Sequence, residues 1–175
     1  SLTACGSTTM QDNTFAAKEN KDFTKYTNQL VVEYAENDYT TMHQFFEHPE
    51  DYGIDINNVD VSLGEFYTDN TEEIKKDQKE LNKFNRSTLD KTQQTIYDEL
   101  KYENELSLKA ENKKFQYLNN CWSTMSGLHQ SLISVFSEYI LRNEKDIQDL
   151  ITLINDVPRY TNDVLEYTKE QADKN

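Results

Sequence analysis

The stretch from Gly127 to Thr168 reads GLHQSLISVFSEYILRNEKDIQDLITLINDVPRYTNDVLEYT and decides the fold class of this chain. Its apolar residues recur every three or four positions, which is typical of amphipathic helices. They are Leu128, Leu132, Val135, Phe136, Tyr139 and Ile140, then Ile147, Leu150, Ile151 and Ile154, then Val164 and Leu165. We predict three helices here: one led by Gly127, one capped by Asn143, and one capped by Asp156 with Pro158 in its first turn. Their links are very short, so they should pack as antiparallel neighbours.

The chain before this stretch shows the same helical spacing. It predicts four further helices, at Lys18 to Asp38, Thr40 to Glu47, Thr71 to Phe84 and Leu89 to Asn112. Ser87-x-x-Asp90 resembles a capping signal for the last of these four. Ile56 to Phe66 is predicted as a loop with some extended backbone. Phe115 to Ser126 breaks the period and is predicted as a loop over the core.

Composition also favours helices over strands. The 175 residues include four Gly and two Pro, whereas a β-rich fold of this length needs many turn residues. Eleven Tyr and eight Phe supply large side chains for a core. We therefore predict an all-α fold, an irregular bundle of about six helices with one long loop region. Residues 18–175 form the helical domain, and residues 1–17 precede it as a flexible tether.

Charge limits the partners of the protein. The formal net charge is −14, and such a surface repels phosphate backbones, so nucleic acid is excluded as an expected partner. No run of the chain approaches the 18 apolar residues of a membrane-spanning helix.

The first residues indicate a lipid anchor. Leu2-Thr3-Ala4-Cys5 resembles the lipobox that ends a bacterial lipoprotein signal peptide. The resemblance implies that the Cys5 thiol carries a diacylglyceryl group, that cleavage makes Cys5 the N-terminus, and that two acyl chains give stable membrane attachment. The alternative is an ordinary terminus of small residues that contains a cysteine. The lipobox interpretation places the protein outside the cytoplasm, anchored to the bacterial cell membrane, and leaves Cys121 unpaired and buried.

The sequence contains no recognisable catalytic or metal-binding motif. His43 and Glu47 are four residues apart and could share a helix face, but two ligands followed at once by His48-Pro49 favour a helix-surface pair over a metal site. Gly-rich phosphate loops, Cys-x-x-Cys pairs and Gly-x-Ser-x-Gly elbows are missing. We therefore predict no catalytic residue, metal or cofactor in this segment.

Three segments together resemble the N-terminal part of the bacterial "domain of unknown function 885" family. The first runs from Tyr39-Thr-Thr-Met-His43 through His48-Pro49-Glu-Asp-Tyr52-Gly53-Ile54. The second is Leu89-Asp-Lys-Thr-Gln93-Gln94-Thr-Ile-Tyr97-Asp98. The third runs from Ser126-Gly127-Leu128-His129-Gln130-Ser131-Leu132 through Glu138-Tyr139 and Arg142-Asn-Glu144-Lys-Asp146 to Asp156-Val157-Pro158-Arg159-Tyr160. Their order matches from about Asp22 onward, although the family often has Pro where this chain has Ile133.

The resemblance implies a longer protein. Members of the family are several times longer, often begin with a lipoprotein signal, and are similar to helical zinc metallopeptidases of the gluzincin type. In those folds N-terminal helices form one wall or lid of a substrate groove. The resemblance places zinc in the full-length protein and no zinc ligand or catalytic Glu in these 175 residues.

Four residues are candidates for lining such a groove. Ser126, Gly127 and His129 lie where a Gly-led helix N-terminus could face a substrate carboxylate, and Trp122 could form part of the wall. The alternative is structural: the first three cap and pack a helix, and Trp122 is a core aromatic residue.

Two functions follow. The first is a non-catalytic N-terminal segment of a surface-anchored lipoprotein that resembles zinc metallopeptidases, with the remainder of its own chain and peptides as partners. The alternative is a stand-alone, non-enzymatic lipoprotein that binds a peptide or a surface protein. The first predicts an unpaired apolar face on the last helices, larger than a monomer normally exposes.

Overall fold

The computed structural model describes residues 17–174, and the prediction of an all-α fold is confirmed. This part of the chain forms six α-helices with short 3-10 turns between them, and no strand occurs within it. The helices are α1 (Lys21–Glu36), α2 (Tyr39–Phe45), α3 (Thr71–Leu81), α4 (Lys91–Ala110), α5 (Leu128–Ser137) and α6 (Glu144–Lys174). Cys5 and most of the predicted tether lie outside the described residues.

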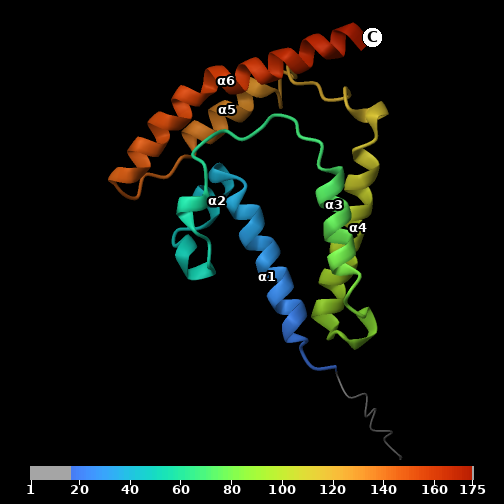
Figure 1. Ribbon diagram of the computed structural model, residues 1–175. Helices are drawn as coiled ribbons and strands as arrows, with labels where there is room; N and C mark the ends of the chain where they lie inside the picture. The colour runs from blue at the N-terminus through green and yellow to red at the C-terminus, as the bar shows by residue number, and fades with distance from the viewer. Residues whose placement is uncertain (1–16, 175) are drawn as a thin grey trace, which may run out of the picture.

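The helices form an irregular bundle in which the long helix α6 runs across the top of the view and α1 to α4 lie below it (Figure 1). The hairpin of α3 and α4 stands beside α1, while α5 lies along α6. The buried apolar residues form three small clusters in place of one large core. The first joins α1 and α2 to Leu153 of α6, the second joins Phe23 of α1 to Leu81 and the α4 residue Tyr97, and the third joins Leu128 of α5 to α6.

The pairing of α5 with α6 is antiparallel, as predicted. Leu128 and Leu132, at the start of α5, pack with Val164 in the second half of α6. Phe136, at the other end of α5, packs against the cluster that contains Leu153, in the first half of α6.

The prediction of two separate helices after Asn143 is wrong, because α6 runs without interruption from Glu144 to Lys174. Pro158 lies inside it and has no N–H to donate to the carbonyl of Ile154, at a cost in helix stability. Burial on both sides of Pro158 offsets that cost, since the fully buried Leu153 and Val164 belong to two different apolar clusters.

Asp156, predicted to cap a helix, instead attaches a loop to α6. Its Oδ2 accepts a hydrogen bond of 2.8 Å from the backbone N–H of Leu63, and its Oδ1 lies 2.6 Å from Arg159 Nε. Arg159 also donates to the carbonyl of Gly64 at 2.8 Å. These contacts hold the segment 61–64 against α6.

Caps were also predicted at the starts of α4 and α6. The N-cap of α4 is Asp90 in a capping box with Gln93, so the prediction that Ser87 begins the capping signal is wrong; Ser87 lies in a 3-10 turn. Gln93 also exchanges hydrogen bonds of 2.9 and 2.8 Å with the backbone of Asn20, which caps α1. The predicted cap at Asn143 is confirmed, because its Oδ1 accepts from the N–H of Lys145 at 2.8 Å.

We predict that Asp156→Asn destabilises the protein by about 1–2 kcal/mol at pH 7, because it removes a charge-assisted contact to Arg159. The Arg159 guanidinium and the Leu63 N–H lower the pKa of Asp156 from its usual value. The stabilisation is therefore complete above about pH 4, the usual pKa of an unfolded Asp, and is lost as pH falls through the lower folded pKa. Urea unfolding at pH 7 and below pH 4 should show the penalty shrinking on acidification. Asp173→Asn, an exposed change on the same helix, serves as the control, and a pH-independent penalty would contradict the assignment.

Candidate functional site

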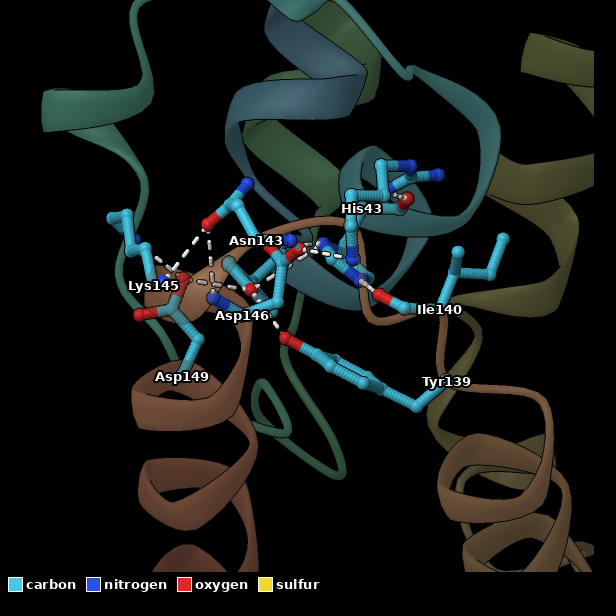
Figure 2. Close-up of polar contacts among 9 residues, drawn as sticks. His43, Tyr139, Ile140, Asn143, Lys145, Asp146 and Asp149 are labelled. Carbon is cyan, nitrogen blue, oxygen red and sulfur yellow. Dashed lines mark hydrogen bonds and ion pairs between the residues drawn. The ribbon is translucent and has the colours of Figure 1, made fainter.

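The most polar buried part of the molecule lies where α2 meets the start of α6 (Figure 2). Tyr39 and His43 are one turn apart on α2, and Asp146 and Asp149 lie in the first two turns of α6. Tyr139 joins them from the link between α5 and α6. The four residues on the helices are all less than 9% exposed. We call these five residues the His43 cluster.

The ring of His43 packs against two tyrosine rings and has polar neighbours at both nitrogens. It stacks on Tyr39 and Tyr139, with centroid distances of 5.5 and 4.2 Å and 12° between the planes in each pair. Nε2 lies 2.7 Å from the carbonyl oxygen of Ile140, so this nitrogen carries the proton and donates. Nδ1 faces Asp146, with 3.8 Å to Oδ1. His43 is thus enclosed by protein groups.

The interpretation of His43 and Glu47 as a helix-surface pair is wrong. α2 ends at Phe45, so Glu47 lies beyond the helix, and the His43 ring points into the protein. His48 is exposed and lies 3.3 Å from Glu50.

Tyr39 connects α2 to the second turn of α6, at Asp149. Its hydroxyl donates to Asp149 Oδ2 at 2.9 Å and lies 2.9 Å from the Tyr139 hydroxyl, which must donate because the Tyr39 proton is already used. Burial, together with the hydrogen bond to Asp149 and the negative charge of that carboxylate, raises the pKa of Tyr39 far above that of free tyrosine. Tyr39 therefore stays a neutral donor. Lys145 forms an ion pair with the same Asp149 oxygen.

Asp146 holds the link that enters α6. Its Oδ2 accepts from the backbone N–H groups of Arg142 and Asn143, at 2.6 and 2.8 Å. The Arg142 side chain in turn donates to the backbone carbonyl of His43 at 2.9 Å. A negative side chain in the first turn also interacts favourably with the helix dipole. The start of α6 is thereby fixed to the end of α2.

A cavity of about 490 Å³ opens beside the His43 cluster. Its wall combines apolar groups with charged ones, including Met42, Phe46, Val59, Arg142, Lys145 and Asp149. Arg142 and Lys145 could hold a ligand carboxylate there. His43 also lines this cavity, with Nε2 hydrogen-bonded to the Ile140 carbonyl.

The described residues offer no ready metal site. Between Ala17 and Lys174, no group of three or more His, Cys, Asp or Glu side chains is placed to hold a metal ion. The same residues contain no helix with the length and hydrophobicity needed to cross a membrane.

The predicted groove residues lie at a different place, around the start of α5. Ser126 and His129 are exposed, and Trp122 is 46% exposed and donates from Nε1 to Thr168 of α6 at 2.9 Å. Gly127 is buried and precedes α5 as its N-cap. None of the four lines the cavity beside His43, and their role in a groove stays a prediction.

Close packing explains why position 127 is glycine. A Cβ atom there would lie 2.5 Å from the carbonyl oxygen of Ser123 and 2.8 Å from that of Cys121, which are backbone atoms that cannot move aside easily. Cys121 itself is buried, as predicted, and burial raises the pKa of its thiol. The turn before α5 is thus tightly packed.

Comparison with family models, curated proteins and solved structures finds no match for the chain. The resemblance to the "domain of unknown function 885" family therefore stays a prediction.

Sequence reasoning missed four members of the His43 cluster. The i, i+4 pair of Tyr39 and His43 and the i, i+3 pair of Asp146 and Asp149 are visible in the sequence as residues on one helix face. Nothing in the sequence shows that these two faces meet, because about 100 residues separate them.

We predict that Tyr39→Phe lowers the free energy of unfolding by about 1–2 kcal/mol, because Asp149 and Tyr139 each lose a buried hydrogen-bond partner. Urea unfolding measures the change. Tyr34→Phe on α1, where the side chain is 66% exposed, is the matched control and should change stability little. Equal effects of the two substitutions would show that the Tyr39 hydroxyl does not support the cluster.

Gly127→Ala should cost about 1–3 kcal/mol, because the added methyl group collides with backbone oxygens. Ser126→Ala, an exposed neighbour, should stay within about 0.5 kcal/mol of the parent. Thermal unfolding by circular dichroism distinguishes them, and a fully stable Gly127→Ala variant would contradict the close packing of this turn.

Proposed function

We propose that this chain is the non-catalytic, N-terminal helical segment of a membrane-tethered lipoprotein that resembles zinc metallopeptidases. In this proposal a lipid on Cys5 holds the protein outside the bacterial cytoplasm. The helices form one wall or lid of a peptide-binding groove, and the remainder of the chain packs on α6. The observation that carries it is an uncovered apolar stripe along α6.

The stripe follows one face of α6. Ile147, Ile151, Ile154 and Leu165 are 43–52% exposed, and Pro158 is exposed between them. Their spacings of four, three, four and seven residues keep them on one side of a helix with 3.6 residues per turn. We call these five residues the α6 stripe.

A different face of α6 is already buried against the rest of the structure. Its residues include Leu153, Val164 and Tyr167, which are 0–7% exposed. At 100° per residue, this buried face is centred about 135° from the α6 stripe. A helix on the surface of a globular protein buries one apolar face and exposes a polar one, whereas α6 has two apolar faces. The second face supports an additional packing partner, because a monomer rarely exposes a long apolar patch.

The proposal assigns no chemistry to residues 17–174. The His43 cluster connects helices, and no described group fits zinc. Peptidase activity and its zinc site would thus belong to the part of the protein that packs on the α6 stripe.

A second candidate function is a stand-alone lipoprotein that binds a peptide or a surface protein without catalysis. A separate observation favours it. An apolar cleft of about 870 Å³ lies between α1 and the α3–α4 hairpin, away from α6.

The α6 stripe provides the test. Residues 1–175 should bind a hydrophobic dye such as anilinonaphthalene sulfonate, and Ile151→Gln with Ile154→Gln should reduce that binding severalfold. Stability should change by less than about 0.5 kcal/mol for each exposed site. The control, Thr152→Gln with Asn155→Gln, alters exposed neighbours on the polar side of the same turns.

The chain extended along its reading frame beyond Asn175 should bind little dye. If it also hydrolyses peptides in a chelator-sensitive manner, the zinc-peptidase assignment is supported. A stop codon directly after Asn175, together with a folded monomer that binds no dye, would overturn the first proposal.

A further inference from the structure

The arrangement of the helices leaves a cleft between α1 and the α3–α4 hairpin. α1 and the hairpin meet through Phe23, Leu81, Leu89 and Tyr97, near the N-terminus of α1. Beyond this contact the elements separate (Figure 1), and the cleft lies between them.

The walls of the cleft carry apolar side chains at helical spacing. Leu30, Val31 and Tyr34 come from α1, and Ile96 and Leu100 come from α4. Val31 and Tyr34 are 48% and 66% exposed. Leu30 and Tyr34, like Ile96 and Leu100, are one turn apart, so each helix presents an apolar ridge to the cleft. This arrangement can receive the apolar face of a third helix.

The rim of the cleft is acidic. Glu33 of α1, Glu73 and Asp77 of α3, and Glu103 of α4 line it, and the lining includes no Lys, Arg or His. Within residues 17–174 none of these four carboxylates forms an ion pair, although seven ion pairs with Lys or Arg occur elsewhere. The rim therefore keeps a net negative charge.

The same negative charges raise the pKa of two titratable groups in the lining. The pKa of Asp77 is raised, first by burial and then by the nearby carboxylates of Glu73 and Glu33. Burial together with Asp77, Glu80 and Glu33 raises the pKa of Tyr26, on the same wall, to about 12. Both shifts are those expected where negative charges gather, and for Asp77 they outweigh the opposite effect of Lys76.

The negative charge of the rim determines which kinds of ligand can bind in the cleft. A second copy of this chain carries a net charge of −14, so it would bring further negative charge to an acidic rim. Anionic lipid headgroups and nucleic acid are repelled for the same reason. An amphipathic helix with Lys or Arg beside its apolar face satisfies both the apolar walls and the carboxylates.

We propose that the cleft between α1 and the α3–α4 hairpin binds a cationic, amphipathic helical segment of a peptide or protein. The apolar face of the ligand contacts Leu30, Ile96 and Leu100, while its basic side chains pair with the rim carboxylates. The proposal deepens the second candidate function and does not rest on what covers the α6 stripe.

The test is direct binding to residues 1–175, followed by fluorescence anisotropy. The probe is a labelled synthetic helix of about 18 residues, about 27 Å long, with Leu on one face and Lys on the other. Two comparison peptides replace every Lys by Glu, or every Leu by Ser. We expect binding of the Lys–Leu peptide and at least ten-fold weaker binding of both comparison peptides, because one loses the charge complement and the other the apolar face.

Matched variants locate the site. Glu33→Gln, Glu73→Gln and Glu103→Gln together should weaken binding of the Lys–Leu peptide about ten-fold, as expected for the loss of three exposed charge contacts. The control triple variant, Glu99→Gln, Glu105→Gln and Glu166→Gln, makes the same change in net charge outside the cleft and should bind nearly as the parent does. Circular dichroism confirms that both variants fold.

Three results would overturn the proposal. Equal binding of the Lys–Leu and Lys–Ser peptides would show non-specific charge attraction, and equal weakening by both triple variants would show that the cleft is not the site. A dimer that Val31→Asp dissociates, and that excludes the peptide, would assign the cleft to a second copy of the chain. The α6 stripe variants leave the cleft unchanged, so failure here is distinguishable from failure of the α6 proposal.

Discussion

The hydrogen bond from Tyr39 to Asp149 anchors the arrangement of this protein. It is buried, it joins residues 110 positions apart, and it belongs to a network in which Asp146 holds the two backbone N–H groups before α6. The network fixes the beginning of the longest helix to α2. Because a buried donor or acceptor without a partner costs more than a hydrogen bond gains, the network also excludes alternative docking of the two elements.

The need for such a connection follows from the core. Apolar residues make up 35% of the chain, and the buried ones form three small clusters. α6 contributes Leu153 to one cluster and Val164 to another, so this helix links the two clusters. The contacts of Asp156 and Arg159 with the segment 63–64 attach a loop to α6. Polar contacts therefore help to hold together helices that three separate apolar clusters join only in part.

Two apolar surfaces stay open to solvent, and their surroundings differ. The border of the α6 stripe mixes Gln148 and Asn155 with Glu144, Glu166 and Lys169, whereas the lining of the α1–hairpin cleft contains four carboxylates and no Lys, Arg or His. A border with charges of both signs does not select for a basic partner. An acidic border suits a basic partner, which a chain with an excess of acidic residues does not supply from a second copy of itself. We propose a binding role for each of the two surfaces.

Local signals in the sequence determined the helix content of this protein. Apolar spacing, few turn residues and the Asn143 cap predict the all-α fold, because each acts within a few residues. The same reasoning failed at Asp156 and Pro158, where a good local start signal was overridden by burial on both sides. Tertiary structure alone decided the His43 cluster, since its two halves lie about 100 residues apart. It also decided which apolar faces stay open: the pattern marks a face as apolar, but the packing of other elements determines whether anything covers it.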